Sequence, residues 1–350
     1  MNFASDNAAG IAPAVLDAIT RANHGHALGY GNDDLTRSVE RRIGELFECD
    51  PAVFLVSTGT AANAFALAHV TPPWGGVLCH AEAHIMVDEC GAPEFFGGAL
   101  KLMGLPGEGC KLAPATLAEA IARHTGHRPH AVQAASVSIS QVSEAGTIYT
   151  PAEVKALAEI AHSRGLKLHM DGARFGNALA RLGVTPAELT WKAGVDVLSF
   201  GATKGGAMAA EAIVIFDRAS ADAMHERRKR GGHLVSKHRF VAAQLDGFLA
   251  DGNWLTWARH ANRQAERLAL GLTRHALPPV WAVDANIVFV VLPAAADARL
   301  RAGGASYYGR PSDGVPAGIT MKKDDVLARL VTSFATTEAE VDRFVDMAGG

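Results

Sequence analysis

Short apolar runs that alternate with helix-forming segments constrain the fold more than any other feature of this sequence. The runs have the length and apolar character of buried strands, and they lie at 52–57, 75–80, 130–140, 166–171, 195–200 and 211–217. Segments with apolar residues at helical spacing lie between several of them, at 60–70, 112–124 and 150–165. Strands separated by helices favour a mostly parallel sheet with helices on both faces. The sequence therefore predicts an α/β fold.

The segment 150–165 carries the clearest helix signal. Thr150 stands at the N-cap position, Pro151 is the first helical residue, and Glu153 follows the cap by three residues. This is the pattern of a capping box, in which side chains satisfy two free backbone N–H groups. Gly165 comes after the last helical turn, so we expect the helix to end before it.

The pattern changes after about residue 240. A long amphipathic segment at 253–276 precedes a strand-like run at 286–292 and a glycine-rich stretch at 302–319. The chain ends with "DVLARLVTSFATTEAEVDRFVDMA", which mixes a further apolar run with a helical pattern. These elements predict a smaller α+β domain at the C-terminal end.

A chain of 350 residues is longer than one hydrophobic core usually covers, so more than one domain is expected. The predicted division is an N-terminal segment at 1–15, a large domain at 16–240 and a small domain at 241–350. We expect the N-terminal segment to pack on the small domain and to contribute to the functional site.

Charge and composition exclude several classes of function. The net charge of −3 and the isoelectric point of about 6.6 argue against nucleic acid or an anionic membrane as a partner. No apolar run reaches the roughly 18 residues that a membrane span needs, and "MNFASDNAAG" lacks the regions of a secretory signal. The four cysteines form no Cys-x-x-Cys pair, which favours reduced thiols without a zinc site. A cytoplasmic protein is expected.

The stretch "STGTAAN" joins a predicted strand to a predicted helix. Thr58, Gly59 and Thr60 there offer hydroxyls and free backbone N–H groups at the start of the helix. Such a turn suits a phosphate group, because the N–H groups and the positive end of the helix dipole point at it. Taken alone, the stretch is more often just a capped helix start.

The stretch "HMDGAR" ends the predicted strand at 166–171 with an acid. A buried carboxylate at Asp171 needs a positive partner, and a protonated pyridine nitrogen is one candidate. Arg174 lies three residues further on, and its planar guanidinium suits a carboxylate or a phosphate. A structural Asp–Arg pair is the alternative explanation.

A lysine and a histidine complete the candidate groups. Lys204 stands among small residues in "SFGATKGG", which leave it open to close approach, and a desolvated lysine there suits Schiff-base chemistry. Most lysines near strand ends are simply solvated. His84 follows the strand at 75–80 and suits stacking on a planar ring, acting as a base, or binding a metal. A histidine with an ordinary structural role is the default.

Together these groups occur in an order that resembles the pyridoxal-phosphate enzymes of the aspartate-aminotransferase fold. The resemblance narrows to the low-specificity L-threonine aldolases, within the β-eliminating-lyase-like group. Its motifs are "FASDNAAG", "NHGHALGYGND", "STGTAAN", "AHIMVDECGAPEFF", "LHMDGARFGNA", "TWKAGVDVLSFGATKGG" and "RLVTSFATTEAEV". The resemblance covers most of the chain, from Phe3 to about Val345, and the combination of motifs is specific although each motif alone is not.

The resemblance implies pyridoxal 5'-phosphate as cofactor and gives each candidate a role. Lys204 would form the Schiff base, Asp171 would pair with the pyridine nitrogen, and His84 would stack on the ring near the substrate's β-hydroxyl. The turn at Thr58, Gly59 and Thr60 would hold the phosphate. Arg174 would lie near the cofactor's phenolic oxygen and the substrate carboxylate. Arg329 of the small domain would hold that carboxylate, with Ser5 nearby. The family needs no metal for this chemistry.

The resemblance also implies a homo-oligomer with shared sites, as a dimer or a dimer of dimers. Tyr30 matches a tyrosine that reaches the neighbouring subunit's site, and Lys237 and Arg239 fall near a basic residue that meets the partner's phosphate. One departure concerns a second histidine that many members carry, where Gln141 stands here. A glutamine can bond the hydroxyl or a cofactor oxygen but exchanges no proton at neutral pH. Proton abstraction would therefore fall to His84 or to water.

The activity implied is that of a carbon–carbon lyase. L-threonine, L-allo-threonine and phenylserine are the candidate substrates, and retro-aldol cleavage would release glycine and an aldehyde. Two alternatives on the same fold are a β-eliminating lyase and an amino-acid racemase that use the same lysine. A non-catalytic binding protein on this scaffold is the remote alternative.

Overall fold

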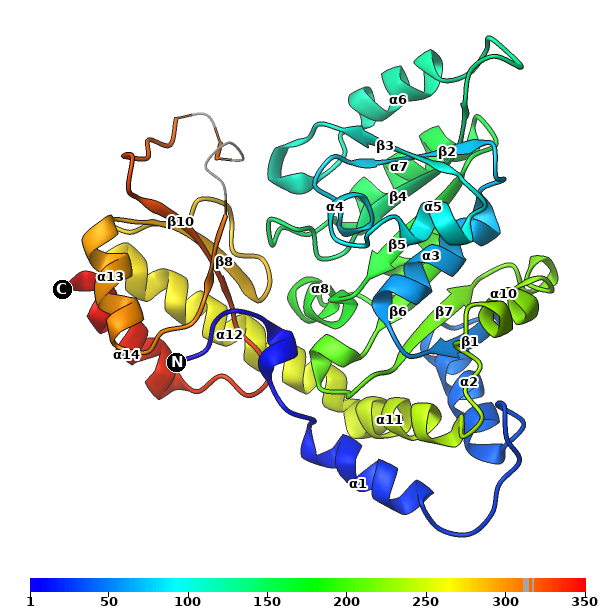
Figure 1. Cartoon of the computed structure of the whole chain (residues 1–350), viewed down its shortest axis with the longest axis horizontal. Coiled ribbons are helices and arrows are strands. Elements are labelled where there is room, and N and C mark those ends of the chain that lie inside the picture. The colour runs from blue at the N-terminus through cyan, green and yellow to red at the C-terminus, as the bar shows by residue number, and fades with distance from the viewer. Residues whose placement is uncertain (311–314, 317) are drawn as a thin grey trace.

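A seven-stranded sheet forms the centre of the larger part of the molecule (Figure 1). The computed structural model describes residues 1–310, 315–316 and 318–350. The strands are β1 (Ala52–Val56), β2 (Gly75–His80), β3 (Lys101–Leu105), β4 (Gln133–Ser140), β5 (Lys167–Gly172), β6 (Val197–Gly201) and β7 (Glu211–Ile215). They lie in the order β1-β7-β6-β5-β4-β2-β3, and only β7 runs antiparallel to its neighbours. The predicted α/β fold with a mostly parallel sheet is confirmed.

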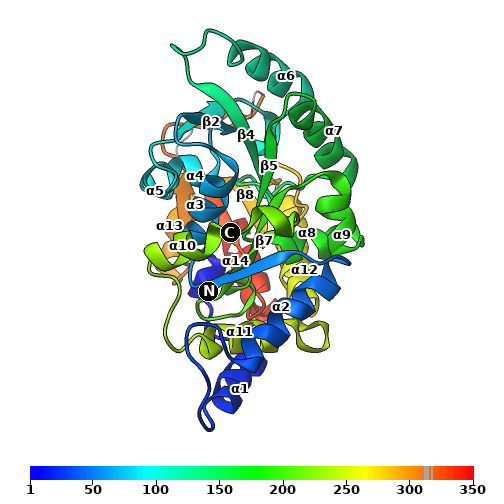
Figure 2. The same ribbon diagram turned by 90° about the vertical axis from the view of Figure 1, so that its right-hand side faces the viewer.

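Helices cover both faces of this sheet (Figure 2). They are α1 (Pro13–Ala22), α2 (Asp34–Leu46), α3 (Gly59–Val70), α4 (His84–Val87), α5 (Ala92–Phe96), α6 (Pro114–Arg123), α7 (Pro151–His162), α8 (Phe175–Leu182), α9 (Pro186–Leu189), α10 (Met224–Arg230) and α11 (Arg239–Leu249). In β1, Val53 and Leu55 face one hydrophobic core while Phe54 and Val56 face the other, as the alternation of a strand requires. Helix α7 begins with the predicted capping box at Thr150.

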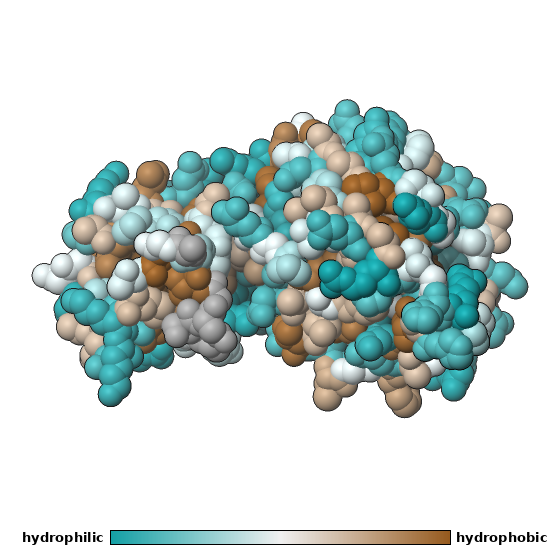
Figure 3. All heavy atoms as spheres, turned by 90° about the horizontal axis from the view of Figure 1, so that it is seen from above, coloured by the Kyte–Doolittle hydropathy of each residue, from teal (hydrophilic) through white to brown (hydrophobic). Residues whose placement is uncertain are grey.

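A second, three-stranded antiparallel sheet lies in a smaller lobe (Figure 1). Figure 3 shows the larger and the smaller lobe side by side from above. Its strands are β8 (Ile287–Leu292), β9 (Tyr308–Arg310) and β10 (Val326–Val331), in the order β8-β10-β9, and its helices are α12 (Asn253–Arg274), α13 (Ala294–Ala302) and α14 (Glu338–Gly349). Helix α12 connects the lobes, because Trp254 belongs to the core of the large sheet whereas Leu268 belongs to the core of the small one. The division predicted at residue 240 stays a prediction. None of the helices in the described part of the chain is long and apolar enough to cross a membrane.

The N-terminal segment lies on the small sheet. The backbone N–H of Phe3 donates to the carbonyl of Ser306 at 2.8 Å, and Val331 donates to the carbonyl of Phe3 at 2.9 Å. The ring of Phe3 is fully buried and packs edge-on against Phe344, with 5.0 Å between ring centroids. This anchoring brings the next residues, the short 3-10 helix Asp6–Ala8, to the cleft between the lobes.

Replacing this anchor tests how far the small lobe depends on it. We expect Phe3→Ala to lower the free energy of unfolding by about 3–5 kcal/mol, because the substitution leaves a cavity in the core. Urea unfolding followed by fluorescence measures the change. Leu16→Ala is the matched control, since Leu16 is 50% exposed on α1 and its truncation should cost little. Equal effects of the two substitutions would contradict the anchoring role of Phe3.

Candidate active site

Seven of the residues predicted from the sequence line one pocket at the carboxyl ends of the central strands. Its volume is about 190 Å³. The seven are Ser5, Gly59, His84, Asp171, Arg174, Lys204 and Arg329. Strand ends of this kind are where open α/β sheets bind their ligands. The large sheet, the N-terminal segment and the small sheet all contribute to the lining, so the site depends on both lobes.

Asp171 offers a buried negative charge near the end of β5. Its Oδ2 accepts a hydrogen bond from Nδ2 of Asn63 at 2.9 Å, and its Oδ1 accepts one from the backbone of Ala173 at 3.0 Å. Burial acts to raise the pKa of Asp171, but the charges of His84 and Lys204 outweigh it and hold the pKa below its usual value. The carboxylate is therefore ionised and able to pair with a protonated ring nitrogen.

Lys204 lies in the 3-10 helix Thr203–Gly205 directly after β6. Burial lowers the pKa of its amine, and the nearby Arg174 guanidinium acts in the same direction. The carboxyl groups of Asp6, Asp171 and Glu211 oppose this shift without cancelling it. A larger share of the amine is thus uncharged at neutral pH than for a solvated lysine, which is the form that attacks a carbonyl carbon.

The small residues next to Lys204 are required for a different reason from the one expected. We expected them to leave room around the lysine for a ligand. A Cβ on Gly205 would lie 2.7 Å from the ring of Phe248, and one on Gly201 would lie 2.7 Å from the backbone of Ala173. These glycines are required by the packing of the protein itself, which presses other elements against the loop.

His84 is oriented by a network of buried polar groups. Its Nδ1 lies 2.8 Å from Oε1 of Glu89, and this hydrogen bond raises the pKa of His84 although burial opposes it. Nδ2 of Asn63 donates to both Glu89 and Asp171, at 2.8 and 2.9 Å. His84, Glu89 and Asp171 are close enough together to suggest a metal site. The amide of Asn63 bridges the two carboxylates as a donor, which fixes Asp171 directly and His84 through Glu89.

Arg174 pairs with an acid that the sequence did not indicate. Its Nε and NH2 atoms donate to the two carboxylate oxygens of Asp6 at 2.7 and 2.9 Å. Nδ2 of Asn286 donates to the same carboxylate at 3.1 Å. Burial acts to raise the pKa of Asp6, but Arg174 outweighs it and the pKa is lowered. The anticipated structural Asp–Arg pair therefore exists, but with Asp6 in place of Asp171.

Arg329 reaches the pocket from β10 on the opposite wall. Burial lowers its pKa to about 10, and the charge of Arg174 adds to the effect. Its Nε is buried and has no hydrogen-bond partner among the described residues. An unpaired buried donor is costly, so this guanidinium is suited to an anionic ligand that enters the pocket. Ser5 is close by, and its hydroxyl accepts a hydrogen bond from the N–H of Asn7.

The predicted phosphate turn is a capped helix start with open space before it. Thr58 is the N-cap of α3, and its hydroxyl accepts a hydrogen bond from the N–H of Ala61 at 3.2 Å. No atom lies within 4 Å of the position that a Cβ on Gly59 would take, and Gly59 lines the pocket. Thr60 is the second residue of the helix and does not line the pocket. The free N–H groups there can receive a phosphate.

Gln141 does not face the pocket. It is fully buried, its Nε2 donates to the carbonyl of Tyr149 at 2.7 Å, and its Oε1 accepts from the N–H of Tyr149 at 2.9 Å. Both ends of the amide are thus used by the backbone, and the prediction that Gln141 contacts the substrate is corrected. The neighbouring Val142 and Glu144 line the pocket instead.

Three predicted residues lie away from this chain's own pocket. Tyr30 is half exposed, with the amine of Lys229 4.8 Å from its ring centroid. Lys237 is exposed, and Arg239 donates to the backbone carbonyls of His24 and Gly25. Their role in a partner subunit's site stays a prediction.

Sequence reasoning missed several residues that the fold brings to the site. They are Asp6, Asn7, Asn63, Asp88, Glu89, Ser140, Glu144 and Arg310. A signal existed for Asp6, which follows Ser5 within a quoted motif, and for Asn63 within "STGTAAN". Nothing in the sequence separates Glu144 or Arg310 from ordinary charged loop residues.

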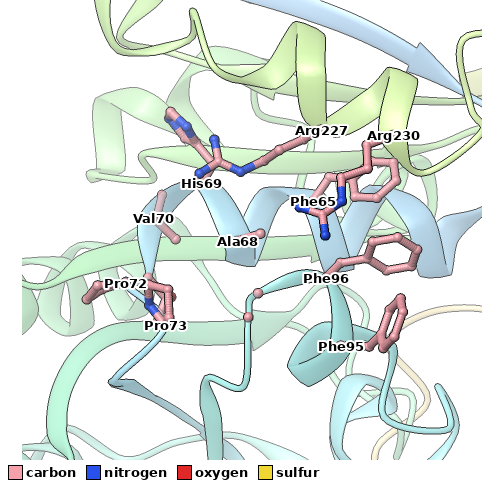
Figure 4. A pocket seen from close by; sticks show the side chains of 13 residues that line it. Phe65, Ala68, His69, Val70, Pro72, Pro73, Phe95, Phe96, Arg227 and Arg230 are labelled. Atoms are coloured by element: carbon pink, nitrogen blue, oxygen red, sulfur yellow. The ribbon is translucent and has the colours of Figure 1, made fainter.

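A larger hollow of about 800 Å³ lies elsewhere, between α3, α5 and α10 (Figure 4). Aromatic rings of Phe65, Phe95 and Phe96 line it together with Arg227 and Arg230. It holds none of the candidate site residues predicted from the sequence. Size alone therefore does not identify the functional site in this molecule.

Residues 2–295 match the model of a family described as beta-eliminating lyase. The chain belongs to this family. A low-specificity L-threonine aldolase from Pseudomonas sp. is 45% identical over 308 residues, which cover 87% of this chain and 88% of that protein. A solved structure of a threonine aldolase from Leishmania major is 29% identical, with a TM-score of 0.91 over 99% of this chain and 98% of that one. A structure of SPT with PLP shares the fold at 16% identity, with a TM-score of 0.71 over 100% of this chain and 86% of that one.

The chain is an enzyme of the aspartate-aminotransferase fold, and pyridoxal 5'-phosphate is its cofactor. The residues of the pocket fit this group. Lys204 provides an amine with a lowered pKa and Asp171 an ionised carboxylate, while the start of α3 leaves open space before Gly59. His84 completes the set as a planar ring held by Glu89.

The pair between Asp6 and Arg174 is open to direct test. We expect Asp6→Asn to lower the free energy of unfolding by about 3 kcal/mol, because it leaves a largely buried guanidinium without a matching charge. The shift of the urea unfolding midpoint measures this loss. Asp17→Asn, at an exposed position of α1, is the matched control and should leave the midpoint unchanged. A midpoint for Asp6→Asn equal to that of the wild type would show that the pair contributes nothing.

Proposed function

We propose that this enzyme cleaves L-β-hydroxy-α-amino acids into glycine and an aldehyde, with L-threonine, L-allo-threonine and phenylserine as substrates. The observation that carries the proposal is the convergence of Lys204, Asp171 and two arginines from different lobes on one pocket. A lysine and an acid of this kind hold the cofactor, and the two guanidinium groups suit the α-carboxylate of an amino acid. The Pseudomonas relative supports the same substrate class, since it is named a low-specificity L-threonine aldolase.

When it is bound, pyridoxal phosphate accepts the electron pair that is released as the Cα–Cβ bond breaks. Lys204 would hold the cofactor through its buried amine, whose pKa is lowered. Asp171 would keep the ring nitrogen protonated, because its own carboxylate stays ionised in the buried site. His84 is the side chain assigned to the ring's face, with Glu89 fixing its orientation.

The substrate carboxylate lies between Arg174 and Arg329 in this proposal. Arg174 is held in place by Asp6, so its direction is set before any ligand arrives. Arg329 has an unpaired buried Nε that a carboxylate oxygen can satisfy. Fixing the carboxylate from two walls leaves one orientation for the Cα–Cβ bond, and such positioning is a large part of catalysis.

The assembly and the location are also proposals. A homodimer is the minimum, with Tyr30 and the Lys237–Arg239 region completing a partner's site, and a dimer of dimers is the preferred state. All three residues lie outside this chain's own pocket, which supports a role toward a second subunit. A cytoplasmic location suits an enzyme of amino-acid metabolism with four free thiols.

Product analysis distinguishes this function from its alternatives. The purified holoenzyme is supplied with threonine, allo-threonine and phenylserine, each in its L and D form. Glycine with an aldehyde from the L forms is the expected result. Ammonia would indicate a β-eliminating lyase, and conversion between L and D forms would indicate a racemase.

Lys204 is tested through the absorbance of the bound cofactor. We expect Lys204→Ala to lose the visible band of the lysine-bound cofactor and to lose activity, because no amine remains to form the covalent link. Lys101→Ala changes an exposed lysine and should keep the band. Retention of the band in Lys204→Ala would remove Lys204 from this role.

Arg329 is tested by comparing two affinities. We expect Arg329→Ala to weaken amino-acid binding by about 10- to 100-fold, the range for losing a hydrogen bond to a charged group. Cofactor affinity should change little, since Arg329 is assigned to the substrate. Arg343→Ala, at an exposed position of the small lobe, serves as the control. An equal loss of cofactor and amino-acid binding would contradict the assignment.

A further inference from the structure

The loop between β4 and α7 carries a carboxyl group, Glu144, into the active-site pocket beside His84. Oε1 of Glu144 accepts a hydrogen bond from the hydroxyl of Ser140 at 2.6 Å and one from the backbone N–H of His84 at 2.9 Å. Oε2 is buried and has no hydrogen-bond partner among the described residues. Glu144 therefore has one oxygen that is held by the protein and one that is left for a ligand.

Hydrogen bonds join the two ends of the loop that bears Glu144 and attach the loop to a neighbouring segment. Gln141 bonds both backbone groups of Tyr149, which joins the start of the loop to its end. The hydroxyls of Ser143 and Thr147 both donate to the carbonyl of Gly109, at 2.9 and 2.7 Å. The loop is thus fastened to a neighbouring segment as well as to itself. Such a frame holds the Glu144 carboxyl in place before a substrate binds.

The surroundings of Glu144 make its carboxyl a better proton acceptor than a solvated one, because they raise its pKa. Burial raises its pKa, while the hydrogen bonds from Ser140 and from the backbone of His84 act in the opposite direction. The ionisable groups around it are His84 on α4, Asp171 on β5 and the more distant Cys79, Cys110 and Tyr149. Further charged residues that line the same pocket are Asp88, Arg174, Lys204, Arg310 and Arg329. The two thiols have pKa values raised to about 12 and the phenol's pKa is raised as well, so these three stay neutral at working pH.

The other ionisable groups of the pocket are less suited to accept a proton from a substrate hydroxyl. Asp171 is ionised but bonded to Asn63 and Ala173, and it is assigned to the ring nitrogen. The Nδ1 of His84 is occupied by its hydrogen bond to Glu89, and this bond raises the pKa of His84. Asp88 is exposed to solvent. Glu144 remains as the partly shielded carboxyl with a free oxygen.

We propose that Glu144 is the catalytic residue that takes the β-hydroxyl proton when the Cα–Cβ bond breaks, an inference that rests on the proposed function. The O–H bond breaks, its proton passes to Oε2 of Glu144, and its electron pair becomes the second bond of the aldehyde carbonyl. The electron pair of the Cα–Cβ bond goes to the cofactor as stated above. One proton is later returned to Cα of glycine, so the reaction is balanced. Gln141 then acts through the loop, as a positioning residue.

The test compares two reactions of the same holoenzyme, cleavage of L-threonine and exchange of the glycine α-proton in D₂O. Exchange needs the cofactor, Lys204 and the carboxylate site but involves no hydroxyl. We expect Glu144→Gln to lower kcat for cleavage by about 10²- to 10⁴-fold, the usual range for a general base. Glycine exchange and the cofactor absorbance should stay within about threefold of the wild type. Glu82→Gln makes the same chemical change at an exposed site outside the pocket and should leave both reactions unaltered.

The variant Ser140→Ala adds a second measurement, the pH dependence of kcat/KM. This dependence would not change if Glu144 had only a structural role. The Ser140 hydroxyl stabilises the ionised carboxyl, so its loss should raise the pKa of Glu144 and shift the acid limb of kcat/KM to higher pH. This variant keeps the carboxyl itself and provides the same test if Glu144→Gln does not fold.

Three outcomes would overturn the proposal. Cleavage by Glu144→Gln within threefold of the wild type would exclude Glu144 as the base. An equal fall of cleavage and glycine exchange would show that the substitution damages the site as a whole. An acid limb that does not move in Ser140→Ala would also contradict it. Failure of the proposed function is distinguishable, because the wild type itself would then exchange glycine protons without cleaving any β-hydroxy amino acid.

Discussion

The buried carboxylate of Asp6 is the contact on which the arrangement of the site depends. It accepts hydrogen bonds from Arg174, which follows β5 of the large sheet, and from Asn286, which precedes β8 of the small sheet. Phe3, three residues earlier, is fixed in the core of the small lobe. One short segment thus joins both lobes at the edge of the pocket, and it directs one of the two arginines that we propose bind a substrate carboxylate.

The pocket balances several charges that would be unfavourable if they were buried singly. Asp171 and Asp6 stay ionised because Lys204, His84 and Arg174 lie near them, and Lys204 loses part of its charge because burial outweighs these acids. Glu211, near the loop of Lys204, differs from the two aspartates, because burial raises its pKa to about 7. Each group therefore takes its protonation state from its neighbours as much as from its own chemistry. A site for amine and carboxylate chemistry requires groups whose pKa values are shifted by their neighbours in this way.

Much of the fold and the centre of the site could be predicted from local patterns. The strand–helix alternation, the capping box at Thr150 and the order of the turn, the histidine, the acid and the lysine all lie in short stretches of sequence. Strand β3 was missed because it is brief and only two of its residues, Leu102 and Met103, are buried. The role of Gln141 was misjudged, because its position in a motif carries no information about which way its amide points.

The sequence by itself determined the fold class, because that rests on residue patterns along the chain. Its resemblance to a known family indicated the cofactor and the residues that we propose hold it. Tertiary structure alone decided that Arg174 pairs with Asp6, 168 residues away in the sequence. It also decided that Glu144 has one oxygen free beside His84, and that Gly205 is required by the ring of Phe248. These are contacts between segments far apart in the chain, and their geometry is set by how the two lobes and the N-terminal segment pack together.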